Sequence, residues 1–259
     1  MNAEPVIQLC GITNRFGRNV VHQDLSLEVY RGEVLGIIGT SGGGKSVLLR
    51  TMAMLHQPAC GKVRLFGRDA LSLTREEEKR IRLQLGFMFQ NGALFSSLTV
   101  FENVRFPLDE HTRLSPALKS EVVMLKIRLA GLEAGAAVKC PRELSGGMVK
   151  RAALARTLVL DPAVLFLDEP TSGLDPVTAG AFDRLVAKLK TMLDLTVVMV
   201  THDLDTLWSA TDRVAFLADK GIVAVAPIEE LVENPHPAIA AYFSGRRAYH
   251  RGEREWNPE

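Results

Sequence analysis

Short apolar runs alternate with amphipathic stretches along much of the chain. Residues 34–38, 164–167 and 196–200 are such runs, and their length and flanking residues predict buried β-strands. The second run follows a stretch with helical spacing at residues 150–160, and the third follows another at residues 179–193. Strands that alternate with helices predict a doubly wound α/β fold whose sheet is mostly parallel.

The regions outside this alternation have other patterns. Residues 6–13, 20–29 and 62–66 are typical of β-strands joined by turns, so we expect an antiparallel β subdomain near the N-terminus. Between residues 90 and 141 the apolar positions recur at helical spacing, most clearly in residues 116–132. That stretch is apolar on one face, which predicts a helical insert; the face carries Leu118, Val122, Leu125 and Leu129.

Composition narrows the functional classes. The 259 residues suit one large α/β domain with a smaller subdomain, and a net charge of +1 gives no reason to expect nucleic acid as a partner. Cys10, Cys60 and Cys140 are far apart in the sequence, which disfavours disulfides and a zinc site and fits a reducing cytosol. The N-terminus lacks a signal-peptide pattern, and no apolar run approaches the roughly 20 residues of a membrane span. We therefore expect a soluble protein that works at a membrane only through a partner.

The first chemical motif directly follows the apolar run at residues 34–38. Its sequence, GTSGGGKS, fits the phosphate-binding loop, in which small residues let backbone N–H groups converge on phosphates at the start of a helix. Lys45 is expected to reach the β- and γ-phosphates of ATP, and the Ser46 hydroxyl to ligate Mg²⁺. The nucleotide-binding candidates here are Gly39, Thr40, Ser41, Gly42, Gly43, Gly44, Lys45, Ser46 and Val47.

Two carboxylates follow the apolar run at residues 164–167. Asp168 at such a strand end can hold Mg²⁺ beside the phosphate loop, and Glu169 can orient and polarise the water that attacks the γ-phosphate. An acidic pair after an apolar strand is otherwise most often a solvated strand end. The phosphate loop upstream favours the functional interpretation.

A third motif, residues 145–147 (SGG), precedes the basic stretch at residues 149–160. Its hydroxyl and backbone N–H groups suit an anion, although a serine at this place is also a common helix cap. The three motifs in this order, together with Gln90 and His202 at matching positions, resemble the ABC ATPase family over residues 6–233. The resemblance implies a P-loop NTPase core with an antiparallel β subdomain and a helical insert.

The resemblance also implies roles for the matching residues. Phe16 would stack on adenine, with a core phenylalanine as the alternative, and Asp175 belongs to a loop at the dimer interface. Lys45, Glu169 and His202 would be catalytic, and Mg²⁺ would be held by Ser46, Gln90 and Asp168. In a head-to-tail dimer with two ATP molecules, the signature residues of one copy would complete the site of the other; they are Ser145, Gly146 and Gly147.

Finer sequence detail resembles one branch of the family. Met148 stands where the family usually has Gln, and residues 90–95 (QNGALF), 100–104 (VFENV) and 151–156 (RAALAR) are similar to the ATPase of MCE-associated, Mla-type phospholipid transporters. This similarity implies a separate membrane permease, an MCE lipid-binding protein, a small STAS-domain protein, and a peripheral place on the cytoplasmic face of the bacterial inner membrane. Two alternatives stay open: the ATPase of an importer for polar solutes, and a non-transport ABC ATPase.

We expect a nucleotide-binding domain over residues 1–242, with a helical subdomain at about residues 91–160, and a C-terminal tail over residues 243–259. The composition of the tail favours a frayed end, whereas its aromatic residues favour docking of residues 242–259 on a second copy. Four apolar residues of the insert either line a groove for a permease helix or pack the insert's own core: Leu94, Phe95, Phe101 and Phe106.

Overall fold

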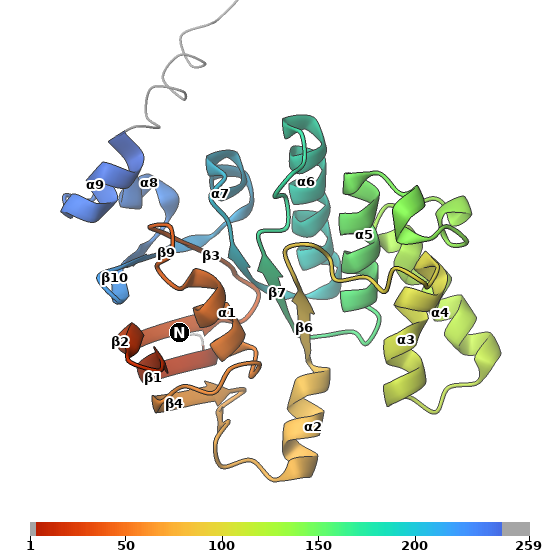
Figure 1. The fold of residues 1–259 in the computed structure, drawn as a ribbon, viewed down its shortest axis with the longest axis horizontal. Coiled ribbons are helices and arrows are strands. Elements are labelled where there is room, and N and C mark those ends of the chain that lie inside the picture. Colours follow the sequence, from red (N-terminus) through yellow and green to blue (C-terminus); the bar gives the residue numbers. More distant parts are fainter. Residues whose placement is uncertain (1–3, 245–259) are drawn as a thin grey trace, which may run out of the picture.

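The computed structural model describes residues 4–244, whose elements form two β-sheets flanked by helices (Figure 1). The strands are β1 Pro5–Phe16, β2 Asn19–Tyr30, β3 Val34–Gly39, β4 Cys60–Leu65, β5 Arg68–Asp69, β6 Leu85–Met88, β7 Val164–Asp168, β8 Thr196–Val200, β9 Arg213–Ala218 and β10 Gly221–Ala226. The helices are α1 Lys45–Met52, α2 Arg75–Leu83, α3 Val100–His111, α4 Pro116–Leu129, α5 Gly146–Thr157, α6 Pro176–Leu193, α7 Leu204–Ala210, α8 Ile228–Val232 and α9 Pro237–Ser244. Two short 3-10 turns, Ala134–Ala136 and Pro141–Glu143, precede α5.

The larger sheet has the strand order β10-β9-β3-β8-β7-β6. Neighbouring strands from β9 to β6 are parallel, and β10 joins β9 as an antiparallel edge. The smaller sheet, with the order β2-β1-β4-β5, is antiparallel. The mostly parallel core and the antiparallel subdomain predicted from the sequence are both confirmed.

Both faces of the larger sheet are covered. Successive side chains of a strand point to opposite faces. One face, which includes Leu35, Phe166 and Val198, packs on α1 and on the smaller sheet. The other face, which includes Leu165 and Val197, packs on α6. Burial on both sides explains why β3, β7 and β8 are continuous apolar runs rather than alternating ones.

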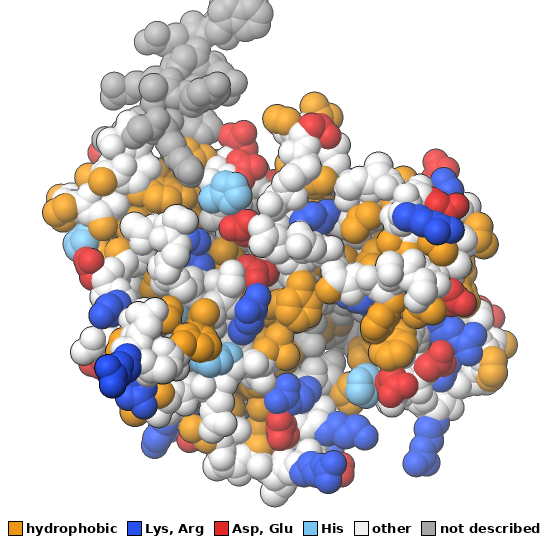
Figure 2. Space-filling view, in the orientation of Figure 1, with side chains coloured by type: hydrophobic (Ala, Val, Ile, Leu, Met, Phe, Trp, Pro, Cys, Tyr) orange, Lys and Arg blue, Asp and Glu red, His pale blue; other side chains and the backbone are white. Residues whose placement is uncertain are grey.

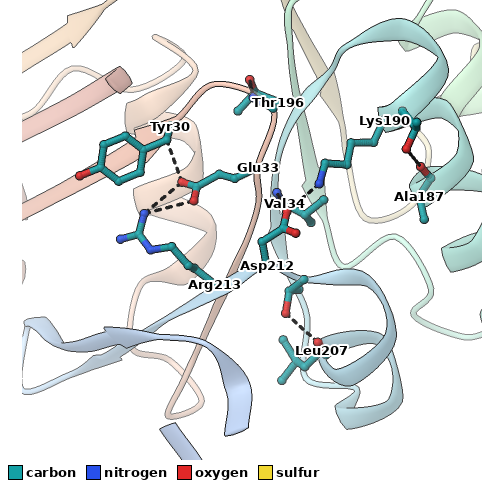
Figure 3. Close-up of polar contacts among 12 residues, drawn as sticks. Tyr30, Glu33, Val34, Ala187, Lys190, Thr196, Leu207, Asp212 and Arg213 are labelled. Carbon is teal, nitrogen blue, oxygen red and sulfur yellow. Dashed lines mark hydrogen bonds and ion pairs between the residues drawn. The ribbon is translucent and has the colours of Figure 1, made fainter. Parts of the chain in front are cut away.

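Charged side chains hold the start of β3 in place (Figure 3). Asp212, just before β9, accepts hydrogen bonds of 2.7 Å from the Val34 backbone N–H and from Lys190 Nζ of α6. Beside it, Glu33 accepts from Arg213 Nη1 at 3.1 Å. The amino end of β3 is thus tied to two neighbouring elements. This anchoring positions the carboxyl end of β3, where the phosphate-binding motif begins.

The helical part predicted between residues 90 and 141 is confirmed, but the apolar face of α4 is not its buried face. Leu118 and Leu125 are 42% and 52% exposed. Val122 and Leu129 are only partly buried. The buried side of the helix is instead formed by Lys119, Val123, Lys126 and Ile127.

Ion pairs explain why two lysines are buried in α4. Lys119 Nζ donates to Asp109 Oδ1 at 2.8 Å, and Lys126 Nζ pairs with Asp161 Oδ1. A lysine whose charge is paired contributes its aliphatic stem to the interior. The pattern of apolar residues therefore predicted the helix but not the side that packs.

Helix α9 is the last described element. Ile239 and Phe243 are buried with residues of β9 and α8. Residues 245–259, most of the tail predicted from the sequence, lie outside the described residues. In the part of the chain that the structure describes, no helix combines the length and apolar character needed to cross a membrane.

Candidate nucleotide site

The phosphate-binding motif joins the carboxyl end of β3 to α1. Gly39 has φ 145°, and a Cβ added there would lie 2.0 Å from the Leu217 carbonyl oxygen. Gly44 is the N-cap of α1 at φ 90°, and a Cβ there would lie 2.3 Å from Val21 Cγ1 and 2.6 Å from His22 Nε2. Only glycine fits at either place. Because Gly44 provides no side-chain cap, the first N–H groups of α1 are available to an anion.

Lys45 opens α1 and folds back over the loop. Its Nζ donates to the main-chain oxygens of Gly39 and Thr40, at 3.1 and 2.9 Å. Burial lowers the pKa of the Lys45 ammonium, and the negative charge of Glu169 opposes that shift. The loop therefore holds a cation at the place where N–H groups converge.

Ser46 and Asp168 meet across the end of the sheet. Ser46 Oγ donates to Asp168 Oδ1 at 2.8 Å, and Arg50 Nη2 lies 3.8 Å from Asp168 Oδ2. Asp168 is only 3% exposed. A hydroxyl and a buried carboxylate beside a phosphate-binding loop are the oxygen ligands that Mg²⁺ prefers, so this pair fits a magnesium site.

Glu169 lies beside this pair and has different contacts. Its carboxylate accepts a 2.8 Å hydrogen bond from Gln90 Nε2, and its Oε1 lies 3.6 Å from His202 Nδ1. Gln90 Nε2 also lies 3.4 Å from Ser172 Oγ. The structure thus brings together Glu169, Gln90 and His202, and it directs the Gln90 amide toward Glu169 rather than toward Ser46.

An aromatic pair lies at the end of β1. Phe16 is 50% exposed, so it is not the core phenylalanine of the alternative interpretation. Its ring stacks on that of His56, with centroids 4.9 Å apart and an interplanar angle of 25°. The pair offers a flat apolar surface of the kind that a purine base stacks on.

The signature segment, residues 145–147, does not join the cluster of side chains around the phosphate loop. Ser145 caps α5 by accepting from Met148 N at 3.3 Å, and a Cβ added at Gly147 would lie 2.7 Å from Thr178 Cγ2. Asp175 caps the adjacent α6, and hydrogen bonds from Thr178 lower the pKa of its carboxyl. Among residues 4–244, none of the contacts of Ser145 reaches Lys45 or Glu169. Residues 145–147 therefore lie at the surface beside the start of α6, away from the phosphate loop.

Sequence reasoning missed two cations of α5. Lys150 Nζ donates to the Gln90 main-chain oxygen, and Arg156 donates at 2.8 Å to the main-chain oxygens of Gly92 and Ala93. These residues were interpreted as part of a basic amphipathic stretch. Their place on the helix that starts at the signature motif was the one feature of the sequence that could have indicated a role near the nucleotide site.

Comparisons with known proteins agree with this geometry. The model of the ABC transporter family matches residues 22–172. The chain is 38% identical over 241 residues to the probable ribonucleotide transport ATP-binding protein mkl of Mycobacterium leprae, covering 93% of this chain and 69% of that protein. It is 39% identical over 229 residues to the intermembrane phospholipid transport system ATP-binding protein MlaF of Escherichia coli, covering 88% and 85%. A solved dimeric ATP-binding cassette with bound ADP and Pi, in a post-hydrolysis state, superposes with a TM-score of 0.78 at 30% identity, covering 86% of this chain and 98% of that one. This chain belongs to the ABC transporter family, as one of its ATP-hydrolysing subunits.

Proposed function

We propose that the chain powers phospholipid transport between the inner and outer membranes of a bacterium through a separate permease. The observation that carries this proposal is the 39% identity to a protein named for intermembrane phospholipid transport, over 88% of the chain. A relative of nearly equal identity is named for ribonucleotide transport. The cargo is therefore the part of the proposal that most needs a direct test.

In this proposal, ATP binds across the ends of β1, β3 and β7. Phe16 stacks on the adenine, while Lys45 and the N–H groups of residues 39–47 bind the phosphates. Lys45 then exchanges its main-chain partners for phosphate oxygens. Ser46 and Asp168 hold Mg²⁺, which neutralises phosphate charge when bound. The 2.8 Å contact between these two side chains supports their assignment to one site.

Hydrolysis depends on the neighbouring carboxylate. Glu169 orients the attacking water and accepts its proton, and His202 contacts the γ-phosphate. Gln90 would help Ser46 and Asp168 to hold Mg²⁺ through its amide oxygen. The contacts that Gln90 and His202 make with Glu169 support a common role for the three side chains.

A second copy completes the site. The exposed Ser145, with Gly146 and Gly147, lies away from the phosphate loop of its own chain, which fits contact with a nucleotide held by a partner copy. Asp175, at the start of α6, lies beside this segment and belongs to the same interface. ATP bound between two copies stabilises the closed dimer, and hydrolysis removes that stabilisation.

The surface over β6 and α3 is proposed to receive a permease helix. Phe95 and Phe106 are 45% and 42% exposed, with ring centroids 5.1 Å apart. Leu94 and Phe101 pack partly against the core instead. Hydrophobic side chains are visible at the surface over this region (Figure 2). An aromatic pair open to solvent fits the apolar face of a helix laid across it.

The organisation of the chain follows from this arrangement. The nucleotide-binding domain includes residues 1–242, and a helical subdomain at about residues 91–160 carries both the permease-facing surface and the signature motif. Because Phe243 is buried in α9, this domain extends to Ser244, and the tail predicted from the sequence begins after that residue. The assembled transporter includes a permease, an MCE lipid-binding protein and a small STAS-domain protein, and this subunit lies on the cytoplasmic face of the inner membrane.

The test is reconstitution of the complex, purified from its native membrane, in liposomes that contain labelled phospholipid. We expect ATP-dependent lipid movement that stops in the Glu169→Gln variant, because that change removes the proton acceptor and leaves the nucleotide contacts in place. Labelled ribonucleotide in the same liposomes is the matched control cargo. ATP-dependent movement of the ribonucleotide without lipid movement would refute the lipid cargo and leave the ATPase assignment intact.

A further inference from the structure

The ammonium group of Lys150 is buried in α5, the helix that begins at the signature motif. The residue is 6% exposed. Its Nζ donates to the main-chain oxygen of Gln90 and lies 3.4 Å from the main-chain oxygen of Glu169. These two acceptors follow the carboxyl ends of β6 and β7. Lys150 therefore bridges two strand ends of the nucleotide site from a helix of the helical subdomain.

The charge of this side chain is costly at such a position. In residues 4–244, Lys150 has no carboxylate within ion-pair distance, whereas the buried Lys119 and Lys126 each pair with an aspartate. Burial lowers the pKa of Lys150, and the charge of Glu169 opposes that shift. A buried cation without an ion pair is less favourable than an apolar side chain of similar length. Its presence beside Glu169 therefore favours a role in the site over a role in packing.

A second cation of α5 holds the same segment of main chain. Arg156 donates at 2.8 Å to the main-chain oxygens of Gly92 and Ala93. With Lys150 on the oxygen of Gln90, one helix binds three carbonyls of residues 90–93. A segment held in this way moves with α5. Because Ser145 caps the start of α5, a displacement of the signature motif is passed on to residues 90–93.

Glu169 meets this assembly at two points. Gln90 Nε2 donates to its carboxylate at 2.8 Å, and Lys150 reaches its main-chain oxygen. We propose that Lys150 is a positioning residue for ATP hydrolysis, which sets Glu169 and Gln90 of its own site according to the position of α5. The inference rests on the roles proposed above for Glu169 and Ser145. It adds that contact of Ser145 with a nucleotide at the partner's site is passed along α5, and through the buried ammonium of Lys150, to the hydrolytic groups of this copy.

The test compares Lys150→Met with Lys126→Met in the full chain. Both changes remove a buried ammonium from the helical part and keep an apolar stem, but Lys126 pairs with Asp161 near the opposite end of β7. Thermal unfolding and the ATPase rate against ATP concentration are measured for each, and rates are expressed per folded protein. Glu169→Gln is measured first. Loss of its turnover supports the proposed role of Glu169, so the later result concerns Lys150 alone.

We expect both methionine variants to lower the Tm, but only Lys150→Met to lower kcat, by about tenfold, while KM changes by less than about threefold. Its Hill coefficient should fall toward about 1, because the two sites lose their link. Lys150→Arg, which keeps the charge and the donors, should recover most of the loss. Equal loss of kcat in the two methionine variants, or unchanged kcat and cooperativity in Lys150→Met, would overturn the proposal. If Lys150→Met does not fold, Lys150→Gln is judged by the same two outcomes.

Discussion

Replacing His22 with phenylalanine is expected to change how the stability of the protein depends on pH. His22 is fully buried against Gly44 of the phosphate loop, and burial lowers the pKa of its imidazole from 6.5 to about 4. Its Nδ1 lies 2.9 Å from Asn14 Nδ2, which also donates to Thr51 Oγ1. Its Nε2 has no hydrogen-bond partner among the described residues. Burial disfavours the charged ring more than the backbone groups of Gly43 and Gly44 favour it, so the folded protein keeps His22 neutral down to a pH of about 4.

The sign of the effect follows from the lowered pKa. As the pH falls from 6.5 to about 4, the unfolded chain protonates at His22 and the folded chain does not. The stability contributed by the neutral ring is therefore fully present above pH 6.5 and is lost toward pH 4. The pKa difference corresponds to about 3 kcal/mol in the free energy of unfolding.

Asp183 has the opposite effect on stability. It is buried between α6 and α7, where Thr206 Oγ1 donates to it at 2.6 Å, and burial raises the pKa of its carboxyl from 3.8 to about 6. As the pH rises through this window, the unfolded chain loses a proton that the folded chain retains. Stability therefore falls by about 3 kcal/mol as the pH rises to 6. In the wild type, the effects of His22 and Asp183 nearly cancel between pH 4 and 6.

Urea unfolding of the nucleotide-free protein between pH 4 and 7 separates the two effects. Relative to the wild type, His22→Phe should lose about 3 kcal/mol as the pH rises from 4 to 6.5, and Asp183→Asn should gain a similar amount from 4 to 6. The double variant should run parallel to the wild type. If His22→Phe and the wild type gave parallel curves, His22 would titrate in the folded protein near its ordinary pKa, and the argument from burial would be wrong.

Three further predictions concern the nucleotide site. Gly44→Ala should lower both the Tm and the affinity for a fluorescent ATP analogue, because its Cβ would lie 2.3 Å from Val21 Cγ1 at a φ of 90°. Phe16→Ala should weaken ATP binding by about two- to tenfold and leave the affinity for inorganic triphosphate unchanged, which titration calorimetry measures, since only stacking on the base is lost. The third prediction uses mixed dimers trapped by a disulfide. Ser145→Arg on one copy and Lys45→Ala on the other should leave one intact site, whereas both changes on the same copy should damage both sites. Equal ATP binding in the two arrangements would exclude site sharing.

The parts of the site that the sequence predicted are those encoded by a few adjacent residues. The phosphate loop is predictable because the apolar run of β3, the glycines and Lys45 follow one another without interruption. The acidic pair is predictable for the same reason, since Asp168 ends the apolar run of β7. Helix α5 was predicted about three residues too late. Gly146 and Gly147 have no side chain that contributes to a periodic pattern, and the cap by Ser145 decides where the helix begins.

The parts that the sequence did not predict depend on partners far along the chain. Lys150 was interpreted only as part of a basic helical stretch, because nothing near it in the sequence indicates that its ammonium contacts the main-chain oxygens of Gln90 and Glu169. Lys126 was hidden for a similar reason, since its partner Asp161 lies beyond the next helix. A prediction from the spacing of apolar residues treats every lysine as polar, whether or not it is buried in the fold. Only the assembled fold shows which lysines have a buried partner.

The backbone of Glu169 shows why two adjacent carboxylates act on different sides of the site. Asp168 ends β7 and accepts from Ser46, whereas Glu169 has φ 47°, in the left-handed region that residues other than glycine seldom adopt. A hydrogen bond of 2.9 Å from its N–H to the Val200 oxygen of β8 holds this turn. The conformation costs roughly 1 to 3 kcal/mol, which a glycine would relieve. Glycine would also remove the carboxylate that meets Gln90 and His202. The strained turn directs the Asp168 carboxylate to Ser46 at the start of α1 and the Glu169 carboxylate to the residues that follow β6 and β8.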